Sequence, residues 1–217
     1  MKRFLFAVFV ACAAPFAVAQ ADFPDKPLKL VAPYAPGGSA DMLARALATH
    51  LSGQLKQPVV VENKPGANTT IAATAVARAP ADGYTLLLAS NASMVLNPLL
   101  YKKLSYDPHR DLKLISILAE APLVLVTNSE TGIKTVADLQ AYAKAHPGKL
   151  NYSSVGLGNP LQLTTELIKS RLHVDAVHVP FNGSAPALTA LLANQTQLMV
   201  DVVSTSLPHI KSGKLVP

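Results

Sequence analysis

Short runs of apolar, β-branched residues alternate with helix-like segments along most of the chain. In the first part, such runs occupy residues 28–32, 58–62 and 84–88, and helical patterns begin at residue 39 and at residue 71. This βαβαβ order is typical of a parallel sheet covered by helices, because a parallel connection must cross over the sheet. The sequence therefore predicts an α/β fold.

The first helical segment has the clearest periodicity. A leucine recurs at every fourth position, at Leu43, Leu47, Leu51 and Leu55. This spacing places the leucines on one face, which we expect to pack on the sheet. Ser39 is expected to cap the helix N-terminus, and Asp41 to lie in its first turn, where an acidic side chain compensates the helix dipole.

A second unit follows a break at Asn97-Pro98 and a polar stretch at residues 106–111. The pattern resumes with an apolar crossing strand at residues 112–118. It predicts further strands at 123–127, 150–153, 176–179 and 197–203, and helices at 136–145, 161–172 and 185–192. We interpret the two units as two α/β lobes with mainly parallel sheets around a hinge and a cleft: lobe 1 at residues 22–118 and lobe 2 at residues 119–217.

The N-terminus predicts export. A basic head, Met1-Lys2-Arg3, precedes an apolar run and the small residues Ala17-Val18-Ala19, so residues 1–19 are expected to be a signal peptide. Cleavage after Ala19 or Ala21 fits equally. The uncharged stretch is shorter than the roughly 20 residues of a membrane span, so we expect no stable membrane insertion after cleavage. We place the mature protein in the periplasm.

Several classes of function are disfavoured. The one cysteine, Cys12, lies inside the predicted signal peptide, which removes thiol catalysis and thiolate metal ligands from the mature chain. Its basic residues are scattered, whereas a nucleic-acid surface needs them clustered. The six histidines show no metal-binding spacing, and no serine lies in a G-x-S-x-G motif. We therefore predict no cofactor, no metal, no nucleic acid and no enzyme activity.

Ligands of parallel sheets bind outside the carboxyl ends of the strands, so the loops at these ends are the candidate site. Four loops, at residues 33–39, 90–93, 153–159 and 180–184, are rich in Gly, Ser and Asn. The candidate ligand-binding residues come from these loops and from two nearby aspartates: Tyr34, Pro36, Gly37, Gly38, Ser39, Asp41, Ser90, Asn91, Ser93, Ser153, Ser154, Gly156, Gly158, Asn159, Asn182, Gly183, Ser184 and Asp201.

Loops of this kind favour a small anion. Glycines let the backbone approach a ligand, and each following helix offers unpaired N–H groups at its positive end. A tight turn capped by Ser39 explains the first loop equally well. Gly156-x-Gly158 lacks the third glycine of a dinucleotide motif, because residue 161 is leucine. Ser184 is interpreted as an N-cap, and Asp201 as a residue that could face the cleft.

Six segments together resemble the Bug family of periplasmic receptors, which serve tripartite tricarboxylate transporters. They are PYAPGGSAD (33–41), VVVENKPGA (59–67), DGYTL (82–86), NPLLY (97–101), PGKLNY (147–152) and HVPFNGSAPA (178–187). The resemblance extends over the whole mature chain.

This resemblance implies a type II periplasmic-binding fold of two α/β lobes. It also implies capture of a small carboxylate, whether a di- or tricarboxylate, an amino acid or an aromatic acid, and its delivery to two membrane permease subunits. By resemblance, main-chain groups and water from residues 36–39 and 153–159 would hold the ligand carboxylate. These are loops that the residue-based reasoning also selects.

Two departures from the family pattern qualify this expectation. Asn159-Pro160-Leu161-Gln162 replaces the usual Thr-Ser-Ser-His, which removes hydroxyl donors and predicts an altered ligand preference. Relatives continue past Leu215 with a strand that returns to the first lobe, whereas this chain stops at Pro217. We therefore expect lobe 1 to lack part of its sheet and to expose apolar surface. A fragment, a truncated gene and a short form remain open.

Three alternative functions remain open at this point. A ligand receptor for a membrane sensor kinase would share the same binding site. A periplasmic hydrolase could use Ser184 or Ser154 as its nucleophile. A truncated chain could also be a nonfunctional remnant.

Overall fold

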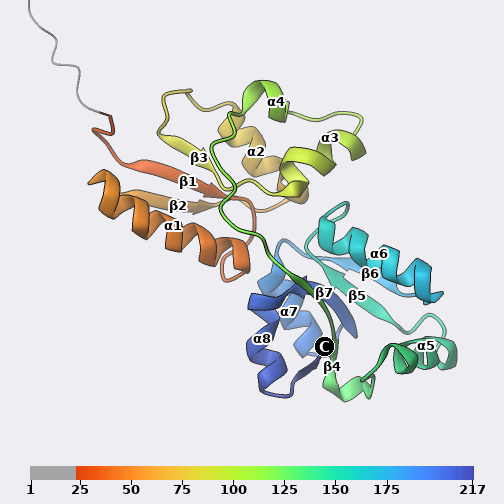
Figure 1. Ribbon diagram of the computed structural model, residues 1–217. Helices are drawn as coiled ribbons and strands as arrows, with labels where there is room; N and C mark the ends of the chain where they lie inside the picture. The colour runs from red at the N-terminus through yellow and green to blue at the C-terminus, as the bar shows by residue number, and fades with distance from the viewer. Residues whose placement is uncertain (1–22) are drawn as a thin grey trace, which may run out of the picture.

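Two separate β-sheets organise the protein, as the computed structural model shows for residues 23–217 (Figure 1). The predicted signal peptide lies outside these described residues. The first sheet has three strands in the order β2-β1-β3, and the second has five in the order β6-β5-β7-β4-β8. We call the elements from β1 to α4 lobe 1 and those from β4 to β8 lobe 2. The predicted α/β architecture is thus confirmed.

Lobe 1 is built on three parallel strands, β1 (Leu28–Ala32), β2 (Val59–Asn63) and β3 (Thr85–Leu87). Helices α1 (Ser39–Leu55) and α2 (Thr70–Ala77) contact this sheet. A short 3-10 helix, η1 (Ala67–Thr69), precedes α2. After β3 come a π-helical segment, η2 (Ala92–Leu96), and two short helices, α3 (Asn97–Leu100) and α4 (Pro108–Asp111).

The contact between α1 and its sheet agrees in part with the expectation. Ala44 and Ala48 are the apolar residues of α1 that are buried in the core with Leu30 and Ala32. The leucines of the predicted stripe flank this line and are only half-buried. Small side chains at the centre let the helix axis lie close to the strands, so the alanines form the centre of the contact while Leu43 and Leu47 pack against its edge.

Lobe 2 is a mixed sheet. Strand β5 (Asn151–Ser154) is parallel to β6 (Val177–Pro180) and β7 (Leu198–Val202), whereas β4 (Leu123–Asn128) is antiparallel to β7 and to β8 (Leu215–Val216). The segments between the strands are η3 (Ser129–Thr131), α5 (Val136–Ala145), α6 (Pro160–Leu172), α7 (Ser184–Leu192) and α8 (Val203–Lys211). Two buried clusters, around Leu191 and around Tyr152, form its core.

The helices that the sequence did not predict are short or contain proline. Helices α3 and α4 have four residues each with proline in the first turn, and α8 contains Pro208. Proline is compatible with the first turn of a helix, where no backbone donor is needed. In the sequence, however, the same residue indicates a break.

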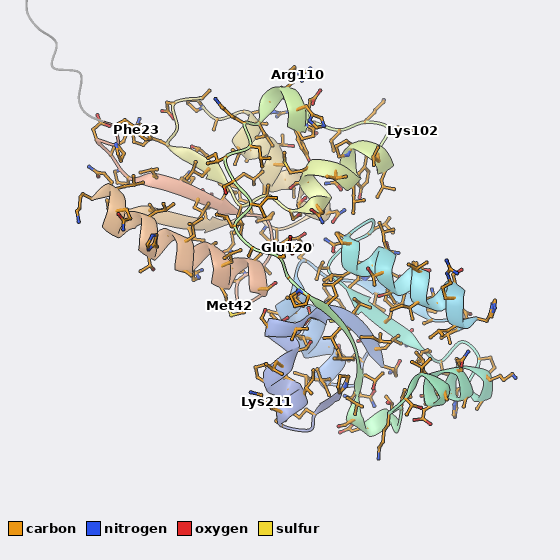
Figure 2. The ribbon with its side chains drawn as sticks, in the orientation of Figure 1. Phe23, Met42, Lys102, Arg110, Glu120 and Lys211 are labelled. Carbon is orange, nitrogen blue, oxygen red and sulfur yellow. The ribbon has the colours of Figure 1, made fainter. Side chains whose placement is uncertain are left out.

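The segment between α4 and β4 corrects one prediction. Residues 112–122 form no strand, although a crossing strand was expected at 112–118. Among the described residues, none pairs with this segment to form a ladder, and the one backbone bond recorded for it is from the Val203 N–H to the Pro122 carbonyl. Its large side chains Leu114, Ile115, Ile117 and Leu118 are exposed. The segment crosses from lobe 1 to lobe 2, with Glu120 between them (Figure 2).

No helix within residues 23–217 combines the length and apolar character needed to cross a membrane.

Candidate functional site

The two lobes meet through loops at the carboxyl ends of their parallel strands. The N–H of Ala35, after β1, donates to the carbonyl of Asn182, after β6, at 2.9 Å. Gly183 has a φ of 149°, and a Cβ placed there would lie 3.0 Å from the Ala35 nitrogen. A side chain at Gly183 would therefore push the lobes apart. The structure brings the first and fourth predicted loops into contact.

The starts of α1 and α7 lie against each other. A Cβ on Gly38 would be 3.7 Å from the Ser184 nitrogen and 3.8 Å from the Ala185 nitrogen. Among residues 23–217, no acceptor is recorded for the N–H groups of Ser39 or Ser184. Two positive helix ends with unpaired donors thus adjoin, which is the arrangement that attracts an anion.

The expected capping roles of the two serines are wrong. The N-cap residues are Gly38 and Gly183, neither of which has a side-chain cap, and each serine is the first helical residue instead. The Ser184 hydroxyl donates to Asp201 at 2.8 Å. Asp201 is fully buried and also accepts from Thr205 and Ser206 of α8. Asp201 therefore links the start of α7 to α8 through hydrogen bonds.

Asp41 fixes the shape of the first loop. Its buried carboxylate accepts from the N–H of Gly37 at 3.0 Å, from Asn63 at 2.9 Å and from Arg45 at 3.0 Å. Burial by itself raises the pKa of Asp41, but the hydrogen bonds from these donors lower it below its usual value. The residue therefore anchors Gly37 and does more than compensate the helix dipole.

A buried polar network crosses between the lobes. The Asn159 side-chain amide, at the start of α6, donates to the Tyr34 hydroxyl at 2.9 Å and to the Asn68 side-chain oxygen at 3.2 Å. Tyr34 is also hydrogen-bonded to Ser90 at 3.3 Å, and Asn68 donates to Asn97 at 2.9 Å. Burial raises the pKa of Tyr34, so its hydroxyl stays protonated. The network holds three loops of lobe 1 to lobe 2.

The backbone N–H groups of the predicted glycine loop after β5 donate hydrogen bonds to side chains of lobe 2. Gly158 donates its N–H to the Gln162 side chain at 3.1 Å, and Gly156 donates to the Ser154 hydroxyl at 3.3 Å. Ser154 is fully buried and lies 2.5 Å from the Nε2 of His178, whose pKa is lowered by burial. Two amides expected to face a ligand are therefore occupied. Gln162, one of the departures from the family pattern, serves here as a loop anchor.

Other predicted site residues lie apart from this contact. Ser153 is buried in β5, and its hydroxyl has no recorded partner. Ser93 is buried and donates to the Ser90 carbonyl at 3.0 Å. Pro36 and Asn91 are exposed. The structure does not bring these four together.

An open pocket of about 250 Å³ lies between the lobes. Its walls come from η1 and the end of α3 in lobe 1, and from the loops after β5 and β6 in lobe 2. The lining residues are Ala67, Asn68, Tyr101, Gly156, Leu157, Pro180, Phe181 and Asn182.

Of the pocket residues, only Gly156 and Asn182 were among the predicted site residues. Asn68 and Tyr101 were missed, although the rule that ligands bind at the carboxyl ends of strands also selects the loop after β2, which contains Asn68. Asn68 has a φ of 46°, in the left-handed region. Tyr101 donates its hydroxyl to the Leu157 carbonyl at 3.2 Å, across the lobes.

Within residues 23–217, no three His, Cys, Asp or Glu side chains come together in a way that could hold an ion.

Comparison with known proteins agrees with this architecture. A family model described as "Tripartite tricarboxylate transporter family receptor" matches residues 43–216. Protein BugT of Bordetella pertussis is 38% identical over 210 residues, which are 96% of this chain and 64% of BugT.

Two similar solved structures carry ligands in their descriptions. One is R. palustris Rpa4515 with adipate, with a TM-score of 0.86 and 36% identity, covering 90% of this chain and 66% of that one. The other is MatC (Rpa3494) from Rhodopseudomonas palustris with bound malate, with a TM-score of 0.82 and 33% identity, covering 89% and 66%. The chain spans less than two thirds of the length of these relatives. On the family match and these identities, the chain belongs to the receptor family of the tripartite tricarboxylate transporters, with the fold of periplasmic binding proteins.

Proposed function

We propose that this protein captures a small carboxylate between its lobes in the periplasm and presents it to the two membrane permease subunits of a tripartite tricarboxylate transporter. The observation that carries the proposal is the meeting of the α1 and α7 starts, each with an unpaired N–H. Asn182, directly before the N-cap of α7, lines the pocket between the lobes. Related structures described with adipate and malate support a carboxylate as the ligand.

Binding without chemical turnover is part of the proposal. The hydroxyls of the two candidate nucleophiles are hydrogen-bonded inside the protein. The Ser184 hydroxyl donates a hydrogen bond to Asp201, and the fully buried Ser154 hydroxyl is hydrogen-bonded with His178. A nucleophile must reach a substrate atom, and a buried hydroxyl does not. The geometry therefore favours a receptor over a hydrolase.

A thermal-shift screen of the purified protein against mono-, di- and tricarboxylates tests the proposal, because a ligand that binds only the native state raises the melting temperature. The matched variants are Gly38→Leu, at the contact between the helix starts, and Gly53→Leu, on the same helix with nothing within 4 Å. We expect Gly38→Leu to lose the shift and Gly53→Leu to keep it. Product formation by the wild type, or equal shifts in both variants, would refute the proposal.

A further inference from the structure

A partly buried histidine is hydrogen-bonded to the wall of the pocket between the lobes. His178 lies on β6 two residues before Pro180, which lines the pocket, so the two side chains share one face of the strand. Its Nε2 lies 2.5 Å from the Ser154 Oγ. That oxygen accepts from the N–H of Gly156, a second lining residue, at 3.3 Å. Ser154 therefore connects His178 to the pocket wall.

The surroundings of the ring disfavour its charged form. Burial is the main cause that lowers the pKa of His178; Glu166 on α6 opposes it, and Lys169 adds to it. Glu166 is paired with Lys169 at 3.0 Å and accepts from the Tyr152 hydroxyl. The Tyr152 ring stacks on His178 with 4.8 Å between the centroids, and burial raises the pKa of Tyr152, so its hydroxyl stays protonated. Without a ligand, His178 is therefore neutral at pH 7.

The hydrogen bonds around Ser154 have a place for one more proton. In the neutral tautomer with the proton on Nδ1 of His178, the Ser154 hydroxyl donates to Nε2 and accepts from Gly156. In the imidazolium form, Nε2–H donates to the Ser154 Oγ, and the hydroxyl turns its own proton to the Gly156 carbonyl, 3.4 Å away. A hydroxyl has one donor and two acceptor positions, and all three are used in the charged form. Protonation therefore leaves no polar atom of Ser154 without a partner.

A bound anion changes the balance at His178. None of the eight lining residues carries a charged side chain, so the negative charge of a carboxylate in the pocket acts on the groups behind the wall. A nearby negative charge favours the charged form of a histidine, and imidazole is the side chain that titrates close to neutral pH. The carboxylate therefore favours proton uptake by the ring.

We propose that His178 is a proton-linked positioning residue of the ligand site: it takes up a proton when a small carboxylate binds in the pocket, and it acts on that ligand through Ser154 and Gly156. The inference rests on the proposed function and adds a pH dependence to it. Linkage is reciprocal, so a proton on His178 strengthens carboxylate binding by the same factor by which the carboxylate strengthens proton binding. The gain in affinity is present at low pH and is lost as the pH rises through the pKa of the liganded form.

Isothermal titration calorimetry measures this proton directly. Adipate and malate, or the acid with the largest thermal shift if neither binds, are titrated into the wild-type protein at pH 6 in MES and in bis-Tris. These buffers differ in ionisation enthalpy, so the difference in binding heat gives the number of protons taken up. We expect net uptake of a fraction of a proton per bound acid, and an affinity about threefold or more higher at pH 5.5 than at pH 7.5. Binding without net uptake would overturn the inference and leave the proposed function intact, whereas no binding of any carboxylate would overturn both.

Three variants assign the proton to one side chain. His178→Gln and His178→Phe remove the titratable ring, the second keeping an aromatic ring against Tyr152, and His109→Gln removes an exposed histidine of α4 as the control. We expect the uptake and the pH dependence of affinity to disappear in each His178 variant that melts cooperatively and to persist in His109→Gln. A merely structural role of His178 would change the affinity equally at both pH values. Uptake that survives in the His178 variants would overturn the assignment, and if neither variant folds, the wild-type proton number alone decides.

Discussion

Replacement of Tyr34 by Phe tests the polar network that joins the lobes. In the structure, the Asn159 side-chain amide donates one hydrogen to Tyr34 and one to Asn68, and Asn159 is only 2% exposed. The variant Tyr34→Phe keeps the ring and removes the hydroxyl. One N–H of Asn159 is then buried without an acceptor while the lobes are together.

The magnitude follows from that orphaned donor. An unsatisfied buried N–H costs about 1–3 kcal/mol, and separation of the lobes gives it water. The free-energy cost therefore applies only to the closed form, in which the two lobes are together. It shifts the closing equilibrium toward the open form by about 5- to 150-fold, which lowers the population of the closed form and with it the apparent ligand affinity. The hydrogen bond between Tyr34 and Ser90 lies within lobe 1, so its loss affects both forms equally.

Fluorescence energy transfer between the lobes measures this shift directly. The only cysteine, Cys12, lies in the predicted signal peptide, so cysteines introduced at the exposed residues Lys56 and Lys144 can be labelled specifically. We expect lower transfer efficiency in Tyr34→Phe than in the wild type. Tyr142→Phe is the matched control, because no hydrogen bond is recorded for the Tyr142 hydroxyl within residues 23–217.

The reasoning is refuted if Tyr34→Phe and Tyr142→Phe give the same transfer efficiency and the same ligand affinity. In that case, the network would not contribute to the closed form.

Three further predictions concern stability. Burial lowers the pKa of His178 below 6.5, so the unfolded chain binds its proton before the folded protein does as the pH falls, and the stability should decrease below about pH 6.5. Urea unfolding at pH 7 and at pH 5.5 should show a smaller decrease in stability for His178→Gln than for the wild type. Equal decreases in the two proteins would contradict this prediction. Gly183→Val and Gly148→Val both force a positive φ, of 149° and 71°, and should each lose about 2 kcal/mol, but only at Gly183 does the added Cβ meet the backbone of the other lobe, the Ala35 nitrogen at 3.0 Å, so only that variant should lower inter-lobe energy transfer. Asp41→Ala leaves three donors, on Gly37, Arg45 and Asn63, without their shared acceptor and should lose about 3 kcal/mol in urea unfolding, whereas a loss below about 1 kcal/mol would show that the loop holds its shape without the carboxylate.

Much of the secondary structure could be predicted because its signals are local. Helix α5 (Val136–Ala145) was predicted with its observed bounds, and α7 (Ser184–Leu192) within one residue. Apolar periodicity and flanking turn residues act over one or two helical turns, so the sequence itself displays them. The antiparallel pairing of β4 with β7 was not evident from the sequence, because the partner strand lies about 75 residues further along the chain.

The candidate site was predictable in part. The rule for strand ends located the glycine loops, and the structure places Gly38 and Gly183 where two helix starts meet. Ser39 and Ser184 are not the N-caps that were expected, and Asp41, which lies in the first turn of α1 as predicted, also accepts from the Gly37 N–H; these contacts depend on partners that the sequence does not place in space.

The sequence by itself determined most of the order of strands and helices and the family, since these depend on neighbouring residues and on patterns along the chain. Export through residues 1–19 stays a prediction. Only the tertiary structure decided which atoms meet. In the folded chain, Asn159 is hydrogen-bonded to Asn68, which lies 91 positions away in the sequence. The N–H of Gly158 donates to the Gln162 side chain, and Tyr101 and Phe181 line the same pocket. The physical reason is that backbone preferences are set within a few residues, whereas hydrogen-bond partners and cavities are set by how the whole chain packs.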